Sequence, residues 1–90
     1  MAASQAAVLT FVKGSTVRSK LLERLASQPH TPTELAALES KHLSHVSRAL
    51  VELRDLGLVA SVDSGSRERY YKVTTQGYAI YATITMRTAK

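Results

Sequence analysis

Cysteine is absent from this sequence of 90 residues. Without a thiol, the chain can form neither a disulfide nor a thiolate metal site, and it cannot sense redox state through cysteine chemistry. Two histidines, His42 and His45, stand three residues apart in an expected helix and could together form one edge of a metal site. No carboxylate or cysteine lies near them on that helix, so we expect no metal.

Long apolar runs are absent as well, and none approaches the length that crosses a bilayer. The N-terminus lacks the basic start of a secretory signal. We therefore expect a cytoplasmic protein that has no membrane among its partners.

A catalytic constellation is also missing. The serines lack a partnered base with an orienting acid, the carboxylates are few and scattered, and no glycine-rich phosphate loop is present. We expect a protein that is not an enzyme and that needs no cofactor.

Acidic residues are scarce, because 7 Asp and Glu face 12 Lys and Arg, which gives a net charge of +5. Such a balance favours a polyanionic partner, although a soluble protein can be basic without one. Position is more informative than the total, since Arg67, Arg69 and Lys72 lie close together with only Glu68 against them. A group of mixed sign in the second expected helix is interpreted as an ordinary solvated surface: Arg18, Lys20, Glu23 and Arg24.

The apolar content of 44% is ordinary for a globular chain, and the length predicts one domain over residues 1–90 with a modest core. Helical spacing of apolar residues predicts helices over 5–13 and 15–27. Ser15 is the expected N-cap of the second helix, and Pro29 ends it. Its expected buried residues are Val17, Leu21, Leu22 and Leu25.

The segment Thr31-Pro32-Thr33-Glu34 is a strong helix start signal. Thr31 can cap, Pro32 suits the first helical position, and Glu34 completes a capping box. The helix that follows is short and ends near Glu39 or Ser40. Its expected packing residues are Leu35, Ala36 and Leu38.

The most informative stretch runs from Lys41 to Leu56, where one helix is predicted with an apolar seam and a split polar face. The seam consists of Leu43, Val46, Leu50 and Leu53. The opposite face begins with hydrogen-bonding and basic residues, namely Lys41, Ser44, His45 and Arg48. The same face then becomes acidic, with Glu52 and Asp55, so only the first turns of this helix suit a DNA groove.

After Gly57, a natural left-handed cap, the pattern changes period. Residues 58–62 and 70–73 are predicted strands, and 63–68 supply turn chemistry for a hairpin. Residues 75–88 fit a helix capped by Thr74 or Thr75, but they also alternate as a strand would. We favour the helix, partly from the resemblance described next.

The order of these elements resembles the small archaeal winged-helix transcription regulators of the ArsR-like and MarR-like kind. The matching segments are 11–15 with Arg18, 31–36, 45–50, 53–59 and 71–77. The resemblance implies a mainly α fold with a small β-hairpin, that is, a winged helix-turn-helix with flanking N- and C-terminal helices. It also implies a homodimer that binds pseudo-palindromic double-stranded DNA through a recognition helix at 41–56. The chain departs from metal-sensing ArsR proteins, because it lacks cysteine and its last helix has no His, Asp or Glu.

Candidate DNA contacts lie on the first turns of the recognition helix. Ser44, His45 and Arg48 are assigned to the major groove, because arginine can bond guanine bidentately and the other two suit phosphates or base edges. Lys41 is a candidate phosphate contact, and Ser47, at the flank of the seam, either joins them or supports the turn between the helices. His42 is expected to pack or to cap. The alternative is a solvated polar face without a ligand.

The predicted hairpin carries the second group of candidate contacts, Arg67, Arg69 and Lys72. Arg67 and Arg69 are two residues apart and so can address one minor groove or its phosphates together. The alternative is a charged hairpin tip whose arginines only keep it soluble.

The flanking helices carry more apolar residues than a three-helix core can cover. These apolar residues predict a dimer interface. They are Val8, Phe11, Val12, Tyr81 and Ile84. The alternative is that they complete the core of one chain. The sequence thus predicts a dimeric, sequence-specific transcriptional regulator, which we expect to be a repressor. The second hypothesis is a winged-helix protein-interaction module, and RNA binding is a weaker third.

Overall fold

Residues 4–63, 65 and 67–88 are described in a computed structural model of the chain. This part contains five helices and one antiparallel hairpin. They are α1 (Gln5–Lys13), α2 (Thr16–Ser27), α3 (Pro32–Glu39), α4 (Leu43–Asp55), β1 (Val59–Val62), β2 (Tyr70–Val73) and α5 (Thr75–Thr88). Among the described residues, no helix combines the length and the apolar character needed to span a bilayer.

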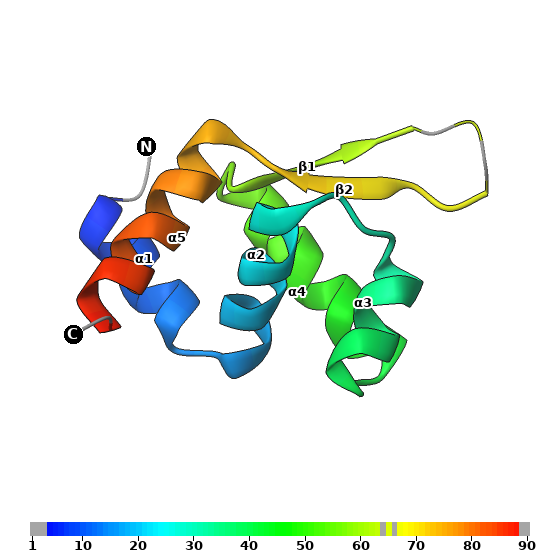
Figure 1. The fold of residues 1–90 in the computed structure, drawn as a ribbon, viewed down its shortest axis with the longest axis horizontal. Coiled ribbons are helices and arrows are strands. Elements are labelled where there is room, and N and C mark those ends of the chain that lie inside the picture. The colour runs from blue at the N-terminus through cyan, green and yellow to red at the C-terminus, as the bar shows by residue number, and fades with distance from the viewer. Residues whose placement is uncertain (1–3, 64, 66, 89–90) are drawn as a thin grey trace.

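The elements are arranged along the longest dimension of a molecule that measures 37 × 29 × 21 Å (Figure 1). The helices α1 and α5 lie side by side at one end, α2 and α4 occupy the middle, and α3 and the hairpin lie at the other end. The expected mainly helical fold with a small hairpin and two flanking helices is confirmed.

Fully buried leucines of three helices form the centre of the core. They are Leu21, Leu22 and Leu25 of α2, Leu35 of α3, and Leu50 and Leu53 of α4. Val12 of α1, Val59 of β1 and Ile80 of α5 extend the same cluster. Each such side chain contributes about 1.5–3 kcal/mol through its removal from water, so the burial of α4 on α2 and α3 fixes the rotation of α4 about its own axis.

The helix starts follow the predicted caps. Ser15 Oγ accepts from the Arg18 amide at 3.2 Å, and Thr31 and Glu34 form the complete capping box. Residues 75–88 are a helix, not a strand, and Thr74 Oγ1 accepts from the Gly77 amide at 3.0 Å in its first turn. Gly57 adopts φ +79° directly after α4, as the left-handed cap requires.

The hairpin pairs Val59 with Val73 and Val62 with Tyr70. On its other edge, β2 exchanges two backbone hydrogen bonds with a single residue, because His30 N donates to Tyr71 O at 3.1 Å and Tyr71 N donates to His30 O at 2.8 Å. The sequence did not predict this bridge, which anchors the hairpin to the link between α2 and α3. Two of the predicted turn residues, 64 and 66, lie outside the described residues.

Two residues expected in the core are on the surface. Leu43 is 49% exposed and Leu38 is 45% exposed. Leu43 is the first residue of α4, and the buried part of that helix begins only at Val46. Leu38 lines an open groove at the end of α3. Helical spacing predicts which face a residue lies on, but the neighbouring elements decide how far along the helix that face is covered.

Candidate nucleic-acid interface

The outward face of α4 carries the predicted recognition residues. Val46, Leu50 and Leu53 have no exposed area, and the opposite side of the helix therefore faces solvent. The residues that are exposed there, or directly before the helix, are Lys41, Ser44, His45 and Arg48. Ser47 is half-buried at the edge of this face, as its position beside the seam predicts.

Three of these side chains are available to a ligand. Within the described ranges of the chain, no residue forms a hydrogen bond or an ion pair with the side chain of Lys41, Ser44 or Arg48. An exposed arginine without an internal partner offers its full set of five N–H donors to an acceptor outside the chain. The first turns of α4 thus present unoccupied donors, as the hypothesis of DNA contact requires.

The expectation that His42 packs or caps is wrong. His42 occupies the N-cap position of α4, but its side chain makes no capping hydrogen bond and is exposed. Its ring instead meets the ring of His45 edge to face, with 5.6 Å between the centroids. The backbone carbonyl of His42 already accepts from the amides of His45 and Val46. Both imidazoles therefore stand at the exposed start of α4.

The hairpin exposes its three predicted basic contacts, Arg67, Arg69 and Lys72. The acidic residue among them, Glu68, accepts a hydrogen bond from Thr33 Oγ1 of α3. This contact joins the hairpin to the start of α3 and engages the one carboxylate between the two arginines. Figure 1 places the hairpin, α3 and the start of α4 at the same end of the molecule.

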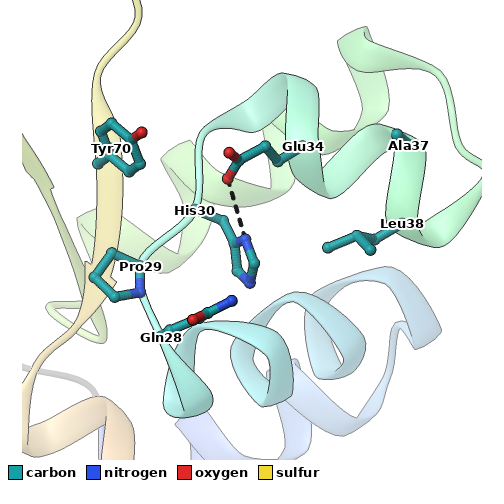
Figure 2. Close-up of a pocket in the computed structure, with 7 residues that line it drawn as sticks. All are labelled: Gln28, Pro29, His30, Glu34, Ala37, Leu38 and Tyr70. Atoms are coloured by element: carbon teal, nitrogen blue, oxygen red, sulfur yellow. Dashed lines mark hydrogen bonds and ion pairs between the residues drawn. The ribbon is translucent and has the colours of Figure 1, made fainter.

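A groove between the end of α2, α3 and β2 contains a hydrogen-bonded pair of His30 and Glu34 that the sequence did not reveal (Figure 2). His30 is 8% exposed, and its Nδ1 lies 3.1 Å from Glu34 Oε1. The same carboxylate oxygen accepts from the Thr31 amide at 3.1 Å. These bonds, the backbone amide first and the imidazole second, lower the pKa of Glu34 below its ordinary value of 4.5. The four-residue spacing of His30 and Glu34 was the available signal.

Acid should therefore destabilise the protein in part through Glu34. A carboxyl whose pKa is lower in the folded state contributes stability above its unfolded pKa of 4.5, and this contribution disappears as the pH falls through the lower, folded value. The Glu34→Gln variant should lose less stability between pH 5 and acid than the parent chain. Urea unfolding at a series of pH values measures the two slopes. Equal slopes would show that the carboxylate gains nothing from these bonds.

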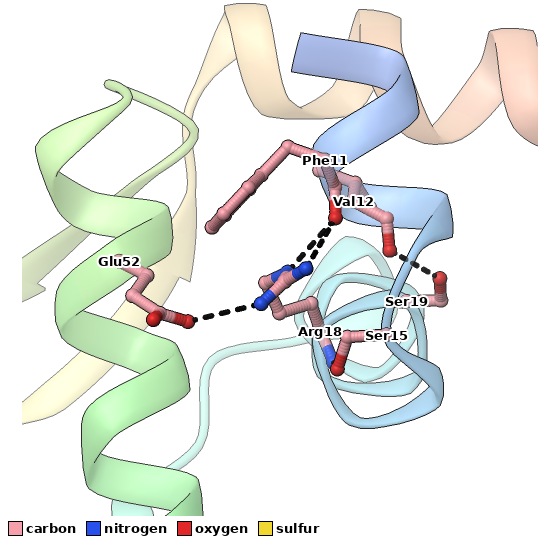
Figure 3. Close-up of polar contacts among 6 residues, drawn as sticks. All are labelled: Phe11, Val12, Ser15, Arg18, Ser19 and Glu52. Atoms are coloured by element: carbon pink, nitrogen blue, oxygen red, sulfur yellow. Dashed lines mark hydrogen bonds and ion pairs between the residues drawn. The ribbon is translucent and has the colours of Figure 1, made fainter. Parts of the chain in front are cut away.

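Arg18 is not part of a solvated surface, contrary to expectation (Figure 3). Its Nε and Nη2 donate to the carbonyl oxygen of Phe11 at 2.9 and 2.7 Å, and its Nη1 donates to Glu52 Oε1 at 3.3 Å. The guanidinium carbon lies 3.6 Å from the centroid of the Phe11 ring. Arg24 likewise pairs with Glu39 of α3, with 2.6 Å between Nε and Oε2. Both arginines of α2 join helices, which no spacing within one helix could show.

The residues predicted for a dimer interface divide into two groups. Val12 is fully buried and Val8 is 9% exposed, so both pack in the core of one chain, as the alternative allowed. Tyr81 and Ile84 are half-buried against that core, and Phe11 is 37% exposed. Sequence reasoning missed two exposed apolar residues of α5, Tyr78 and Met86. Whether this end of the molecule forms an interface stays a prediction.

Comparison with solved structures finds the same fold in other proteins. The chain is similar to HlyU from Vibrio cholerae with a TM-score of 0.79 and 22% identity, over 96% of this chain and 94% of that one. It is similar to the transcriptional regulator BldR from Sulfolobus solfataricus (TM-score 0.75, 22% identity, 80% of this chain and 53% of that one). It is also similar to the adhesin competence repressor AdcR from Streptococcus pyogenes (0.74, 23%, 81% and 56%).

These similarities show that the chain has the winged helix-turn-helix fold. The chain spans about half the length of BldR and AdcR, whereas it matches HlyU over nearly its whole length. No protein-family model matches the sequence, and no curated protein matches it either. The archaeal part of the resemblance is supported by BldR alone among these three.

Proposed function

We propose that this protein is a DNA-binding regulator of transcription that inserts the first turns of α4 into the major groove. The observation that carries the proposal is the outward face of α4, where the side chains of Lys41, Ser44 and Arg48 are exposed and have no partner in the described part of the chain. The winged helix-turn-helix fold provides the geometry in which such a helix enters the groove. Two structurally similar proteins are named as a transcriptional regulator and a repressor.

The roles of the contacts follow from their chemistry. Arg48 reads guanine, Ser44 and His45 bond base edges or phosphates, and Lys41 neutralises a phosphate. The hairpin lies along the adjacent DNA backbone. The exposed charges of Arg67, Arg69 and Lys72 supply affinity that does not depend on the DNA sequence. Ser47 supports the edge of this surface. The protein acts in the cytoplasm and needs no metal or cofactor for this binding.

A homodimer accounts for the exposed apolar residues at the other end of the molecule. Phe11, Tyr78 and Met86 lie on α1 and α5, which are at the end of the molecule opposite α3 (Figure 1). A twofold pairing through these helices places two copies of α4 about 34 Å apart, one turn of DNA, on a pseudo-palindromic site. Occupation of a promoter by this dimer represses transcription.

Salt dependence tests this function. The affinity for a random-sequence DNA duplex should fall steeply as salt is added, because binding releases counterions from the phosphates. The Arg67→Ala variant should bind more weakly to every sequence, and the slope of log affinity against log salt should decrease by about 1. Fluorescence anisotropy at several salt concentrations measures both quantities.

The second hypothesis, a protein-interaction module, predicts a different result. Such a module needs no basic hairpin and should show no measurable DNA binding even at low salt. Selection of bound fragments from random DNA provides the complementary test. A twofold-symmetric selected site supports both sequence recognition and dimerisation, and a site without symmetry contradicts the dimer.

A further inference from the structure

Glu52 does not pair with Arg48, although its position on α4 favours that pairing. It follows Arg48 by four residues on α4, and opposite charges at this spacing on a helix are neighbours that attract each other. In the structure the Glu52 carboxylate instead accepts from Arg18 of α2 at 3.3 Å, and Arg48 has no partner among the described residues. The arginine assigned to DNA is thus without a partner among the described residues, and another arginine binds the nearby acid.

Arg18 is itself held in place by α1 (Figure 3). Phe11 lies in the last turns of α1, where backbone carbonyls lack a partner within the helix. Two N–H groups of Arg18 satisfy this carbonyl, and the Phe11 ring covers the guanidinium from 3.6 Å. The Arg18 side chain is only 18% exposed. It is therefore fixed where it can hold Glu52 but is not itself a DNA contact.

A groove of about 330 Å³ between α2 and α4 gives Glu52 room to move. Arg18, Arg48 and Glu52 all line it, together with His45. If the bond to Arg18 were lost, the carboxylate could turn within this groove towards Arg48 without displacing any core residue. It would then occupy the guanidinium that reads DNA and place a negative charge next to the phosphates.

We propose that Arg18 is a positioning residue for DNA binding, which draws the Glu52 carboxylate away from Arg48 and so keeps Arg48 available to the groove. This inference rests on the proposed function. It assigns a role to a residue on a helix that does not enter the DNA, through a contact that spans 34 positions of sequence.

The test uses four variants of the full chain and a random-sequence DNA duplex at low salt. Arg18→Gln frees Glu52, and Arg18→Gln with Glu52→Gln also removes the freed charge. The matched controls are Arg24→Gln, alone and with Glu39→Gln, because this pair also joins α2 to another helix and carries the same charges. Each single variant removes one positive charge, and each double variant leaves the net charge unchanged.

Arg18→Gln should bind the duplex about fivefold more weakly than Arg24→Gln. Both variants lose the same charge, but in Arg18→Gln the freed Glu52 carboxylate also pairs with Arg48. Arg18→Gln with Glu52→Gln should bind within about twofold of the parent chain, as should the control double variant. NMR of the arginine Nε–H groups gives an independent readout without DNA. The signal of Arg48 should shift in Arg18→Gln and return in the double variant.

Three results would overturn the proposal. They are equal affinities of Arg18→Gln and Arg24→Gln, no recovery in the Arg18 and Glu52 double variant, or an unchanged Arg48 signal. The second would mean that Arg18 acts through packing alone. If Arg18→Gln does not fold, Arg18→Lys keeps the charge but replaces the three donor nitrogens of the planar guanidinium with a single ammonium nitrogen, so it cannot reproduce the contacts with Phe11 and Glu52 together. It should show a smaller loss with the same recovery by Glu52→Gln. Failure of the parent chain to bind DNA would contradict the proposed function instead.

Discussion

Replacing Gly77 with alanine should lower the free energy of unfolding by about 3 kcal/mol, because the added methyl group has no space. A Cβ at this position would lie 1.9 Å from the carbonyl oxygen of Leu58 and 2.8 Å from Cγ2 of Val73. The first neighbour is backbone and cannot turn aside as a flexible side chain could. For a chain of this length the loss is a large share of the total stability, which is about 5–13 kcal/mol.

The surrounding hydrogen bonds prevent α5 from moving away to make room. Thr74 N donates to Leu58 O at 3.0 Å, and Thr74 Oγ1 donates to Gly57 O at 2.6 Å while it accepts from Gly77 N. The end of α4, the start of β1 and the start of α5 are thus joined within a few ångströms. A shift of α5 would break these bonds, so the strain of the new methyl group remains in the folded state.

Gly65→Ala is the matched control. Gly65 adopts φ +81°, and a Cβ there would meet nothing within 4 Å, so this variant pays only for the left-handed backbone, about 1 kcal/mol. Urea unfolding of both variants, followed by circular dichroism, measures the difference. A Gly77→Ala variant as stable as the Gly65→Ala variant would mean that α5 does not approach Leu58 so closely.

Arg48→Ala should weaken binding to a selected DNA site by about 2 kcal/mol, which is about thirtyfold in affinity. Arg48 is the one arginine on the outward face at the start of α4, and its side chain has no partner among the described residues. Its loss removes a bidentate contact with a base as well as one positive charge. Discrimination between the selected site and random DNA should therefore decrease together with affinity.

Arg54→Ala supplies the control for charge. Arg54 is also exposed on α4, but it lies in the last turn and pairs with Asp55 at 3.5 Å. Its replacement should weaken binding to selected and random duplexes about equally and by only a fewfold. Competition titrations with the two duplexes measure the ratio of affinities. If Arg48→Ala keeps the parent ratio, α4 does not read sequence through this residue.

Local signals in the sequence predicted the elements with few errors. Caps at Ser15 and Thr31, the stop at Gly57 and the helical spacing of the leucines each act within a few residues, and the structure confirms them. The same spacing predicted the outward face of α4, because the burial of Val46 and Leu50 leaves Arg48 on the opposite side. Leu43 and His42 were misjudged because helical phase does not say where the covering neighbours end.

The sequence by itself determined the order of helices and strands as far as residue 73 and the exposed basic face of α4. These follow from periodicity, capping and charge, which are properties of neighbouring residues. The helix at 75–88 and the winged helix-turn-helix arrangement were expected partly from the resemblance to known regulators. Only the tertiary structure decided that Val12 belongs to the core of one chain, that His30 pairs with β2, and that Arg18 holds Glu52. These contacts join residues far apart in the chain, and a packed interior places such residues together by shape, which no local pattern records.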